Sequence, residues 1–213
     1  MRKLKWYFDF ISPFAYFQLK QIPDLPDDLQ VEYVPVLFAG LLKYWGNVGP
    51  AEFEPKRQHT YRYCQWYADR HDIPFTMAEA HPFNPISILR LAIQQGSNAG
   101  DIEAIFDTVW CQGLAPNSSE FWKVLSTRIG RECNSDEVFA DDVKLQLRMN
   151  TEQAIAETVF GVPTFQVGGE IFWGTDSFST LLDYLANPEI FQDPKYIQIA
   201  NTPSVAQRNI STK

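Results

Sequence analysis

The chain opens with apolar side chains at every second position, separated mainly by charged ones, which predicts a strand over residues 4–10. Ser12 follows as the hydroxyl of a helix N-cap. Pro13 takes the first helical position, where a missing N–H costs nothing. A helix is therefore expected over about 13–21, and QVEYVPV at 30–36 predicts a second strand.

The middle of the chain changes to a helical period. A short helix over 37–45 precedes it, and helices are expected over 52–71, 85–96, 101–112, 117–129 and 136–158. In the first of these longer helices, Phe53, Cys64 and Ala68 fall on one face. In the last, Phe139, Val143 and Leu147 follow the helical spacing.

The end of the chain returns to strands. VPTFQVGGEIFW reads as strand, turn and strand, because the Gly168–Gly169 pair strongly favours a hairpin. DSFSTLLDYL over 176–185 predicts a closing helix capped by Asp176 or Ser177. The remaining residues, 188–213, are expected to form an irregular appendage.

The order of elements predicts the fold class. It runs β-α-β, a block of helices, then β-β-α, and removing the helices leaves the thioredoxin arrangement. We therefore expect an α/β protein whose thioredoxin-like domain consists of residues 1–50 and 160–187. A helical domain, 51–159, is inserted between the halves, and 188–213 is a C-terminal tail.

Composition narrows the classes of partner. The 213 residues carry a formal net charge of −8 without a dense Lys/Arg run, so nucleic-acid binding and a membrane-surface role are not expected. No uncharged apolar run reaches about 18 residues, and the N-terminus does not read as a targeting signal.

Cysteine and histidine spacing points to a reducing compartment and to no metal. The three cysteines, Cys64, Cys111 and Cys133, are far apart and form no Cys-x-x-Cys pair, which favours a cytoplasmic location. The three histidines have no ligand-like spacing, so no metal site is expected.

Ser12 stands where a thioredoxin-like domain carries its reactive thiol, at the start of the first helix. Ala15 takes the place of the second cysteine, so this motif cannot exchange disulfides. A serine hydroxyl and helix N–H groups could instead hold a thiolate brought by another molecule, and glutathione is the obvious carrier. A plain Ser-Pro helix cap is the alternative interpretation.

Two further motifs favour the thiolate interpretation. Pro163 is expected to be cis before the third strand, leaving the backbone of Val162 to pair with a cysteinyl peptide; a strand-initiating proline is the alternative. Asp176 could take the α-ammonium of a γ-glutamyl group, while helix N–H groups take its carboxylate. Capping alone is the alternative there, and both can hold.

Several stretches together resemble one family. They are YFDFISPFAY, GNVGP, KRQHTYRYCQWYA, AHPFNP, VFGVPTF and EIFWGTD, and they span residues 7 to about 185. With them the chain resembles the 2-hydroxychromene-2-carboxylate isomerases of the DsbA-like superfamily, which are related to the kappa-class glutathione transferases.

The resemblance implies glutathione as cosubstrate, with Ser12 hydrogen-bonded to its sulfur. It implies a small aromatic or conjugated substrate, and a homodimer is expected from the family alone. The other implied glutathione contacts are Phe14, Asn47, Lys56, Val162, Pro163, Thr175, Asp176 and Ser177. The implied substrate contacts are Phe14, Trp45 and Asn84. The alternatives are a helix cap for Asn84, a solvated charge for Lys56 and core packing for Trp45.

The residue types imply a mechanism. Ser12 stabilises a glutathione thiolate, which adds to a conjugated double bond, allows rotation and is then expelled, giving cis-trans isomerisation. A kappa-like glutathione transferase or peroxidase, which uses the same thiolate, is one alternative. A redox-inactive, thioredoxin-like interaction module is another. A DsbA-like disulfide oxidase is disfavoured by the missing cysteine pair.

Two positions depart from the family pattern. The last helix of the family usually opens Gly-x-Asp-Arg, and here Ser177 replaces the arginine. The residues after GNVGP are Ala51, Glu52 and Phe53, where the naphthalene-pathway isomerases carry polar or basic groups. Glutathione binding is therefore better supported than the chromene substrate.

Overall fold

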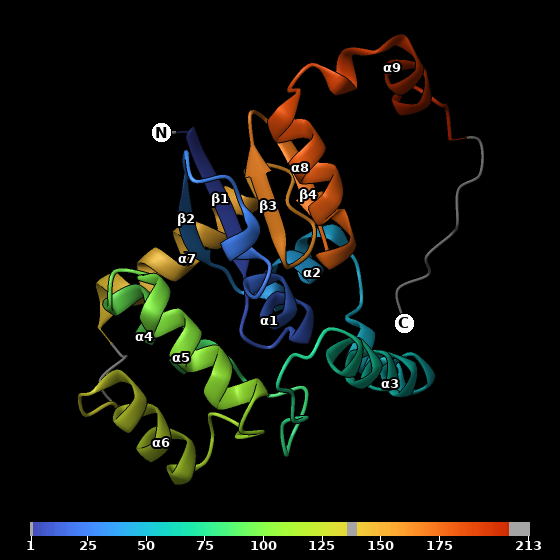
Figure 1. Cartoon of the computed structure of the whole chain (residues 1–213). Coiled ribbons are helices and arrows are strands. Elements are labelled where there is room, and N and C mark those ends of the chain that lie inside the picture. The colour runs from blue at the N-terminus through green and yellow to red at the C-terminus, as the bar shows by residue number, and fades with distance from the viewer. Residues whose placement is uncertain (1, 136–139, 205–213) are drawn as a thin grey trace.

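A four-stranded mixed sheet in the order β2-β1-β3-β4 forms the centre of the computed structural model, which describes residues 2–135 and 140–204 (Figure 1). β1 runs parallel to β2 and antiparallel to β3, and β3 pairs antiparallel with β4. The strands are β1 (Arg2–Phe8), β2 (Leu29–Pro35), β3 (Thr164–Val167) and β4 (Glu170–Trp173). The predicted thioredoxin-like arrangement is confirmed.

Helices fill the spaces between and after the strands. α1 (Pro13–Leu19) and the 3-10 turn η1 (Ile22–Asp24) join β1 to β2. Between β2 and β3 lie α2 (Phe38–Trp45), η2 (Pro50–Glu52), α3 (Glu54–Arg70), α4 (Ile86–Gln94), α5 (Ala99–Trp110), α6 (Ser119–Ile129) and α7 (Asp141–Ala156). After β4 come η4 (Thr175–Ser177), α8 (Phe178–Ala186), η5 (Ile190–Gln192) and α9 (Pro194–Ala200).

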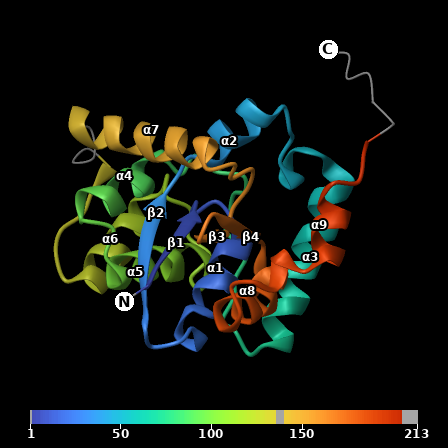
Figure 2. The same cartoon turned by 90° about the horizontal axis from the view of Figure 1, so that it is seen from above.

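Both faces of the sheet are covered. α2 and α7 lie on one face, with α1 and α8 on the other (Figures 1 and 2). Tyr7 packs with the α2 and α7 side, whereas Trp6 and Phe8 face the larger cluster on the α1 side. The alternation along β1 therefore distributes side chains between two apolar clusters.

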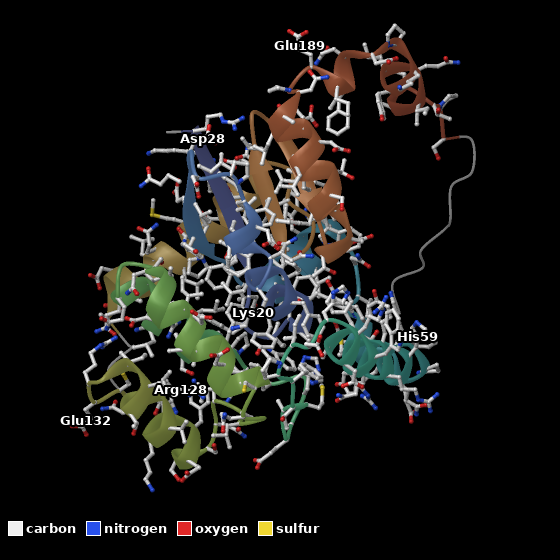
Figure 3. All side chains as sticks on the ribbon, viewed as in Figure 1. Lys20, Asp28, His59, Arg128, Glu132 and Glu189 are labelled. Atoms are coloured by element: carbon white, nitrogen blue, oxygen red, sulfur yellow. The ribbon has the colours of Figure 1, made fainter. Side chains whose placement is uncertain are left out.

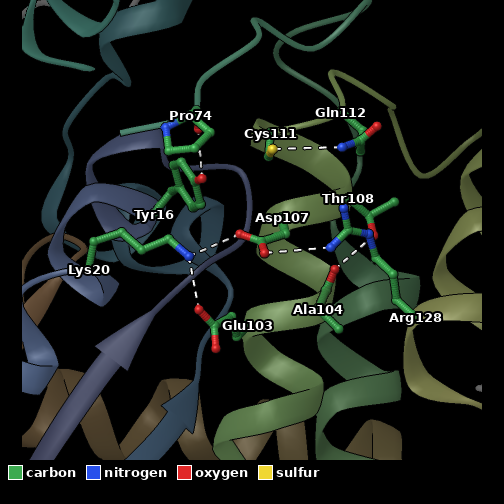
Figure 4. Close-up of polar contacts among 10 residues, drawn as sticks. All are labelled: Tyr16, Lys20, Pro74, Glu103, Ala104, Asp107, Thr108, Cys111, Gln112 and Arg128. Carbon is green, nitrogen blue, oxygen red and sulfur yellow. Dashed lines mark hydrogen bonds and ion pairs between the residues drawn. The ribbon is translucent and has the colours of Figure 1, made fainter. Parts of the chain in front are cut away.

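The inserted helices share the main apolar cluster with the sheet. Phe106 of α5 lies against Trp6 and Phe8, with ring centroids 6.0 and 5.7 Å apart. At the surface, Lys20, the C-cap residue of α1 that Figure 3 labels, forms ion pairs with Asp107 at 3.0 Å and with Glu103 at 2.9 Å, both on α5 (Figure 4). Apolar burial between these parts provides the main stabilisation, because exposed ion pairs contribute little.

Several expected boundaries are corrected by the structure. β1 ends at Phe8, not at residue 10, because the buried carboxylate of Asp9 accepts hydrogen bonds from the N–H groups of Ile11 and Phe38 and turns the chain. α3 begins at Glu54, and Phe53 is 60% exposed, so it is not on the buried face. α7 begins at Asp141, and Phe139 lies outside the described residues.

The tail is more regular than predicted as far as it is described. Phe191 of η5 stacks on Tyr184 of α8, with ring centroids 5.6 Å apart, and α9 then projects from the body (Figure 1). The aromatic contact explains why the chain continues as ordered turns beyond the last core helix. Among the described helices, none has both the length and the apolar character that crossing a membrane requires.

Candidate functional site

Ser12 begins α1 and is almost completely buried, with 7% of its surface exposed. Its Oγ accepts a hydrogen bond from Ala15 N at 3.3 Å, and its N–H donates to the carbonyl of Asp9 at 3.1 Å. The predicted N-cap is confirmed. The hydroxyl hydrogen remains available to an acceptor, because Ser12 Oγ itself only accepts in this cap.

Residues 9–12, here called the Ser12 turn, are held by buried side chains. Trp110 Nε1 donates to the carbonyl of Phe10 at 2.9 Å, and His81 Nε2 lies 2.8 Å from the carbonyl of Ile11. Burial raises the pKa of Asp9 to about 7, although the N–H groups of Phe38 and Ile11 lower it. The backbone of this turn is thus bonded on several sides.

The loop before β3 lies beside this turn. The Val162–Pro163 peptide is cis, as predicted. Tyr7 pairs with Thr164, and this antiparallel register brings Pro163 next to the end of β1. Gly161 is required by packing, because a Cβ there would approach Trp173 Nε1 to 2.6 Å.

The turn after β4 joins the same group. Gly174 N–H donates to the carbonyl of Pro163 at 2.9 Å, and Gln18 Nε2 of α1 donates to the carbonyl of Gly174 at 2.9 Å. Gln18 also accepts from Trp6 Nε1 at 2.7 Å, which holds its amide in place. Hydrogen bonds therefore connect α1, the Pro163 loop and the Gly174 turn into one unit.

Ser177 occupies the N-cap position of α8, as one of the two predicted residues, but the side-chain capping hydrogen bond is not formed. Ser177 precedes α8, but its hydroxyl turns back to donate to the carbonyl of Gly174 at 2.8 Å, and neither it nor Asp176 caps α8 with its side chain. The 3-10 turn η4 explains the difference, because it occupies the position where the helix was expected to begin. Thr175 is buried, and the exposed Asp176 forms no ion pair with a described residue.

The two aromatic residues predicted at the substrate site contact different parts of the chain. Phe14 of α1 is half-buried, and its ring centroid is 6.0 Å from that of Tyr63 on α3. Trp45 is 42% exposed, and its Nε1 donates to the carbonyl of Val159 at 3.0 Å. Trp45 is thereby anchored to the segment that leads into Val162.

The remaining predicted residues are exposed and are not hydrogen-bonded to the Ser12 group. Asn47 Oδ1 accepts from Val48 N at 2.8 Å. Lys56 on α3 has no ion-pair partner in the described part of the chain. Asn84 Oδ1 accepts from Ile86 N at 3.1 Å just before α4, whose N-cap residue is Pro85, so Asn84 bonds the helix start without being the helix cap considered as its alternative.

Sequence reasoning missed several side chains that hold the site. Asp9, Gln18, Tyr61, His81 and Trp110 support the Ser12 turn or the loops beside it. No functional role was predicted from the sequence for Asp9, Gln18 or Trp110. The one available signal was the position of Asp9, a charged residue only three positions before Ser12. Tyr61 and His81 stand in motifs that carried the family resemblance, but their spacing alone does not indicate these contacts.

The cysteines take no part in this group. None of the three forms a disulfide bond with another described residue, and burial raises the pKa of the Cys64 thiol to about 12, so this thiol is not reactive at neutral pH. Within residues 2–135 and 140–204, no cluster of histidine, cysteine or acidic side chains is arranged to hold a metal ion.

Comparison with known proteins agrees with this architecture. The family model of the DsbA-like thioredoxin domain matches residues 3–186. A 2-hydroxychromene-2-carboxylate isomerase of Pseudomonas putida is 29% identical over 178 residues, covering 80% of this chain and 88% of the relative. Glutathione S-transferase kappa 2 of Caenorhabditis elegans is 26% identical over 207 residues, covering 87% and 92%.

A solved structure carries the fold comparison. The structure of a 2-hydroxychromene-2-carboxylate isomerase superimposes with a TM-score of 0.76 at 24% identity, covering 91% of this chain and 98% of that one. The match to the family model of the DsbA-like thioredoxin domain extends over most of the chain, from β1 to the end of α8. The chain therefore belongs to the DsbA-like thioredoxin-domain family, and its relatives include 2-hydroxychromene-2-carboxylate isomerases.

Proposed function

We propose that this protein is a glutathione-dependent isomerase of the 2-hydroxychromene-2-carboxylate isomerase type, acting on a small conjugated or aromatic substrate. One observation carries the proposal. A buried serine hydroxyl, Ser12, takes the place of the reactive thiol in a DsbA-like domain whose Pro163 loop is retained. The sequence relatives bear the names of enzymes, an isomerase and a glutathione transferase, which supports a catalytic role.

Glutathione fits the polar groups around Ser12. The backbone of Val162 lies outside the β3 ladder and makes no backbone hydrogen bond to another described residue, so it can pair with a cysteinyl backbone. The unpaired carboxylate of Asp176 suits the α-ammonium group of a γ-glutamyl residue, beside Thr175 and Ser177. Asn47 and Lys56 are proposed near the glycyl carboxylate or the substrate.

The chemistry needs no protein thiol. The Ser12 hydroxyl donates a hydrogen bond to the glutathione sulfur, keeps its own hydrogen and so stabilises the thiolate. The thiolate forms a C–S bond with the conjugated substrate, and the electron pair of the double bond moves into the conjugated carbonyl. Rotation about the resulting single bond precedes return of that pair, cleavage of the C–S bond and release of the thiolate. Nothing is oxidised or reduced, and glutathione is regenerated.

Aromatic surface beside the site suits such a substrate. Phe14 follows Ser12 by two residues on α1, and Trp45 is hydrogen-bonded to Val159, three residues before Val162, with 42% of its surface exposed. Asn84 is proposed at the same site by family position. A cytoplasmic location and homodimerisation stay predictions from the sequence.

Glutathione titration of the native protein and of Ser12→Ala tests the proposal. Calorimetry measures binding, and ultraviolet difference absorption near the thiolate band measures ionisation of the bound thiol. We expect the native protein to bind glutathione as thiolate. Ser12→Ala should lose about two decades of rate with the substrate, as for other lost anion-stabilising contacts.

A matched control removes another serine hydroxyl. Ser179 is exposed on α8, and Ser179→Ala should leave binding and the thiolate signal unchanged. No binding by the native protein at millimolar glutathione would refute the proposal and favour an interaction module instead.

A kappa-like transferase is the second candidate, favoured by the named relative of Caenorhabditis elegans. It uses the same thiolate but leaves glutathione in the product. Mass analysis of the products separates the two. An isomer of unchanged mass with full recovery of glutathione supports the isomerase, whereas a conjugate supports the transferase.

A further inference from the structure

One peptide group of the Ser12 turn is bonded at both of its polar atoms. The carbonyl of Ile11 and the N–H of Ser12 belong to the same peptide. His81 Nε2 lies 2.8 Å from that carbonyl, and the N–H donates to the carbonyl of Asp9 at 3.1 Å. Since a carbonyl only accepts, the hydrogen between His81 and Ile11 is on Nε2.

Tyr61 of α3 extends this contact. Its Oη lies 2.7 Å from His81 Nδ1 and 2.9 Å from the backbone carbonyl of His81. With the hydrogen on Nε2, the Nδ1 atom of a neutral imidazole accepts, so the single hydrogen of the Tyr61 hydroxyl is shared between Nδ1 and the backbone carbonyl of His81. The result is a directional chain of hydrogen bonds from Tyr61 through His81 to the peptide of Ser12.

The surroundings favour the neutral imidazole that this chain requires. Burial lowers the pKa of His81; the contact with Ile11 opposes this effect, and the positive charge of Arg57 on α3 adds to it. The imidazole also packs edge-on against Trp110, with ring centroids 5.5 Å apart, so its plane is held from the side. Trp110 is the residue that bonds the neighbouring carbonyl of Phe10.

We propose that His81 is a positioning residue of the glutathione site. With Tyr61 it holds the Ile11–Ser12 peptide, and through that peptide it sets the direction in which the Ser12 hydroxyl meets the sulfur. This role rests on the proposed function, because it is defined by the thiolate that Ser12 stabilises. It also assigns the inserted helices a part in catalysis: residues of α3 and of the loop before α4 position the turn that carries Ser12.

Two substitutions of His81 separate its two nitrogens. In His81→Gln the side-chain amide can still donate from the position of Nε2, whereas His81→Asn keeps only an atom near Nδ1. Tyr61→Phe removes the other end of the chain. Tyr67→Phe is the control, because Tyr67 lies on the same helix and its hydroxyl makes no hydrogen bond to a described residue.

The readout is the pKa of the bound glutathione thiol, taken from the thiolate absorbance as a function of pH. We expect His81→Asn to raise this pKa by about one unit, a roughly tenfold loss of thiolate at pH values below it. Tyr61→Phe should raise it less, His81→Gln should keep most of the native value, and Tyr67→Phe should match the native protein. A merely structural role would lower the melting temperature without this order of thiol pKa values.

Unchanged thiol pKa values in both His81→Asn and Tyr61→Phe would overturn the inference and leave the proposed function intact. If His81→Asn does not fold, the thiol pKa values of Tyr61→Phe and His81→Gln decide whether the inference holds. Nitrogen NMR of the ligand-free protein provides a separate test, because a hydrogen on Nδ1 in place of Nε2 would also overturn it. Absence of glutathione binding in the native protein would refute the proposed function and, with it, this role of His81.

Discussion

The Ser12 turn and the surface formed by α2 and α3 are built differently. In the turn, Asp9 and Phe10 are completely buried and the backbone is bonded by side chains from α5 and from the loop before α4. Along α2, α3 and the segment between them, large apolar side chains stay exposed to solvent. Tyr44, Val48, Phe53 and Trp66 are 63, 59, 60 and 56% exposed.

The difference separates two tasks. Stabilising a thiolate requires a hydroxyl held in one direction, which a buried turn bonded on several sides supplies. Accepting an aromatic substrate requires surface that can adapt, which exposed rings with few polar contacts supply. We therefore expect changes in the turn to alter thiol chemistry and stability, and changes along α2 and α3 to alter substrate preference.

The largest difference between a residue of the Ser12 turn and an exposed residue should appear in the pH dependence of the free energy of unfolding. Burial raises the pKa of Asp9 to about 7, so the folded protein keeps a proton that the unfolded chain loses near pH 4. The stability contributed by this proton is full below about pH 4 and is lost as pH rises to about 7, a change on the order of 4 kcal/mol. The measurement is the free energy of unfolding by denaturant, taken for the native protein and for Asp9→Asn at several pH values in this range. The difference between the two proteins at each pH gives the contribution of the Asp9 proton.

The control for that measurement is an exposed acid without a described partner. Asp176→Asn should follow the native pH dependence, because Asp176 is exposed and forms no ion pair with a described residue. A constant difference between the native protein and Asp9→Asn from pH 4 to 7 would show that Asp9 is ionised throughout.

A smaller contrast is expected between two tryptophans. Trp110→Phe leaves the buried carbonyl of Phe10 without its donor, and we expect a loss of about 1–3 kcal/mol of unfolding free energy. Trp66→Phe on α3 changes an exposed ring and should cost less than about 0.5 kcal/mol. Equal losses in chemical denaturation would remove the distinction drawn between the turn and the α3 surface.

The smallest difference in this comparison is kinetic and should come from Trp45. Trp45→Ala removes an exposed ring beside the Val162 segment, so we expect KM for an aromatic substrate to rise about fivefold, close to 1 kcal/mol of lost contact. Glutathione affinity should stay unchanged. Trp66→Ala is the matched control, and steady-state kinetics that cannot tell it from Trp45→Ala would remove Trp45 from the substrate site.

Much of the fold was predictable because local chemistry and tertiary structure agree in it. The Gly168–Gly169 pair and its flanking residues predicted the hairpin, and Ser12-Pro13 predicted the start of α1, because turn and cap preferences act over a few residues. The end of the last strand was different. There a 3-10 turn precedes α8, and the hydroxyl of Ser177, at the N-cap position, donates backward to Gly174 instead of accepting from the helix.

The candidate site divides in the same way. Ser12 and Pro163 were identified from short motifs, because the position of each in its own element is a local property. Asp9, His81 and Trp110 were not, since the groups that they bond lie 29, 70 and 100 positions away in the chain. No spacing rule connects residues over such distances.

By itself, the sequence of this protein determined its order of strands and helices, the exclusion of disulfide exchange at Ser12 and the family resemblance, because each depends on neighbouring residues. Only the tertiary structure decided what surrounds Ser12. Folding brings α1, α5, the loop before α4 and the Pro163 loop together, and buried polar groups there must find partners wherever the packed chain offers them. A hydroxyl that local sequence made a helix cap thereby becomes the centre of a candidate thiolate site.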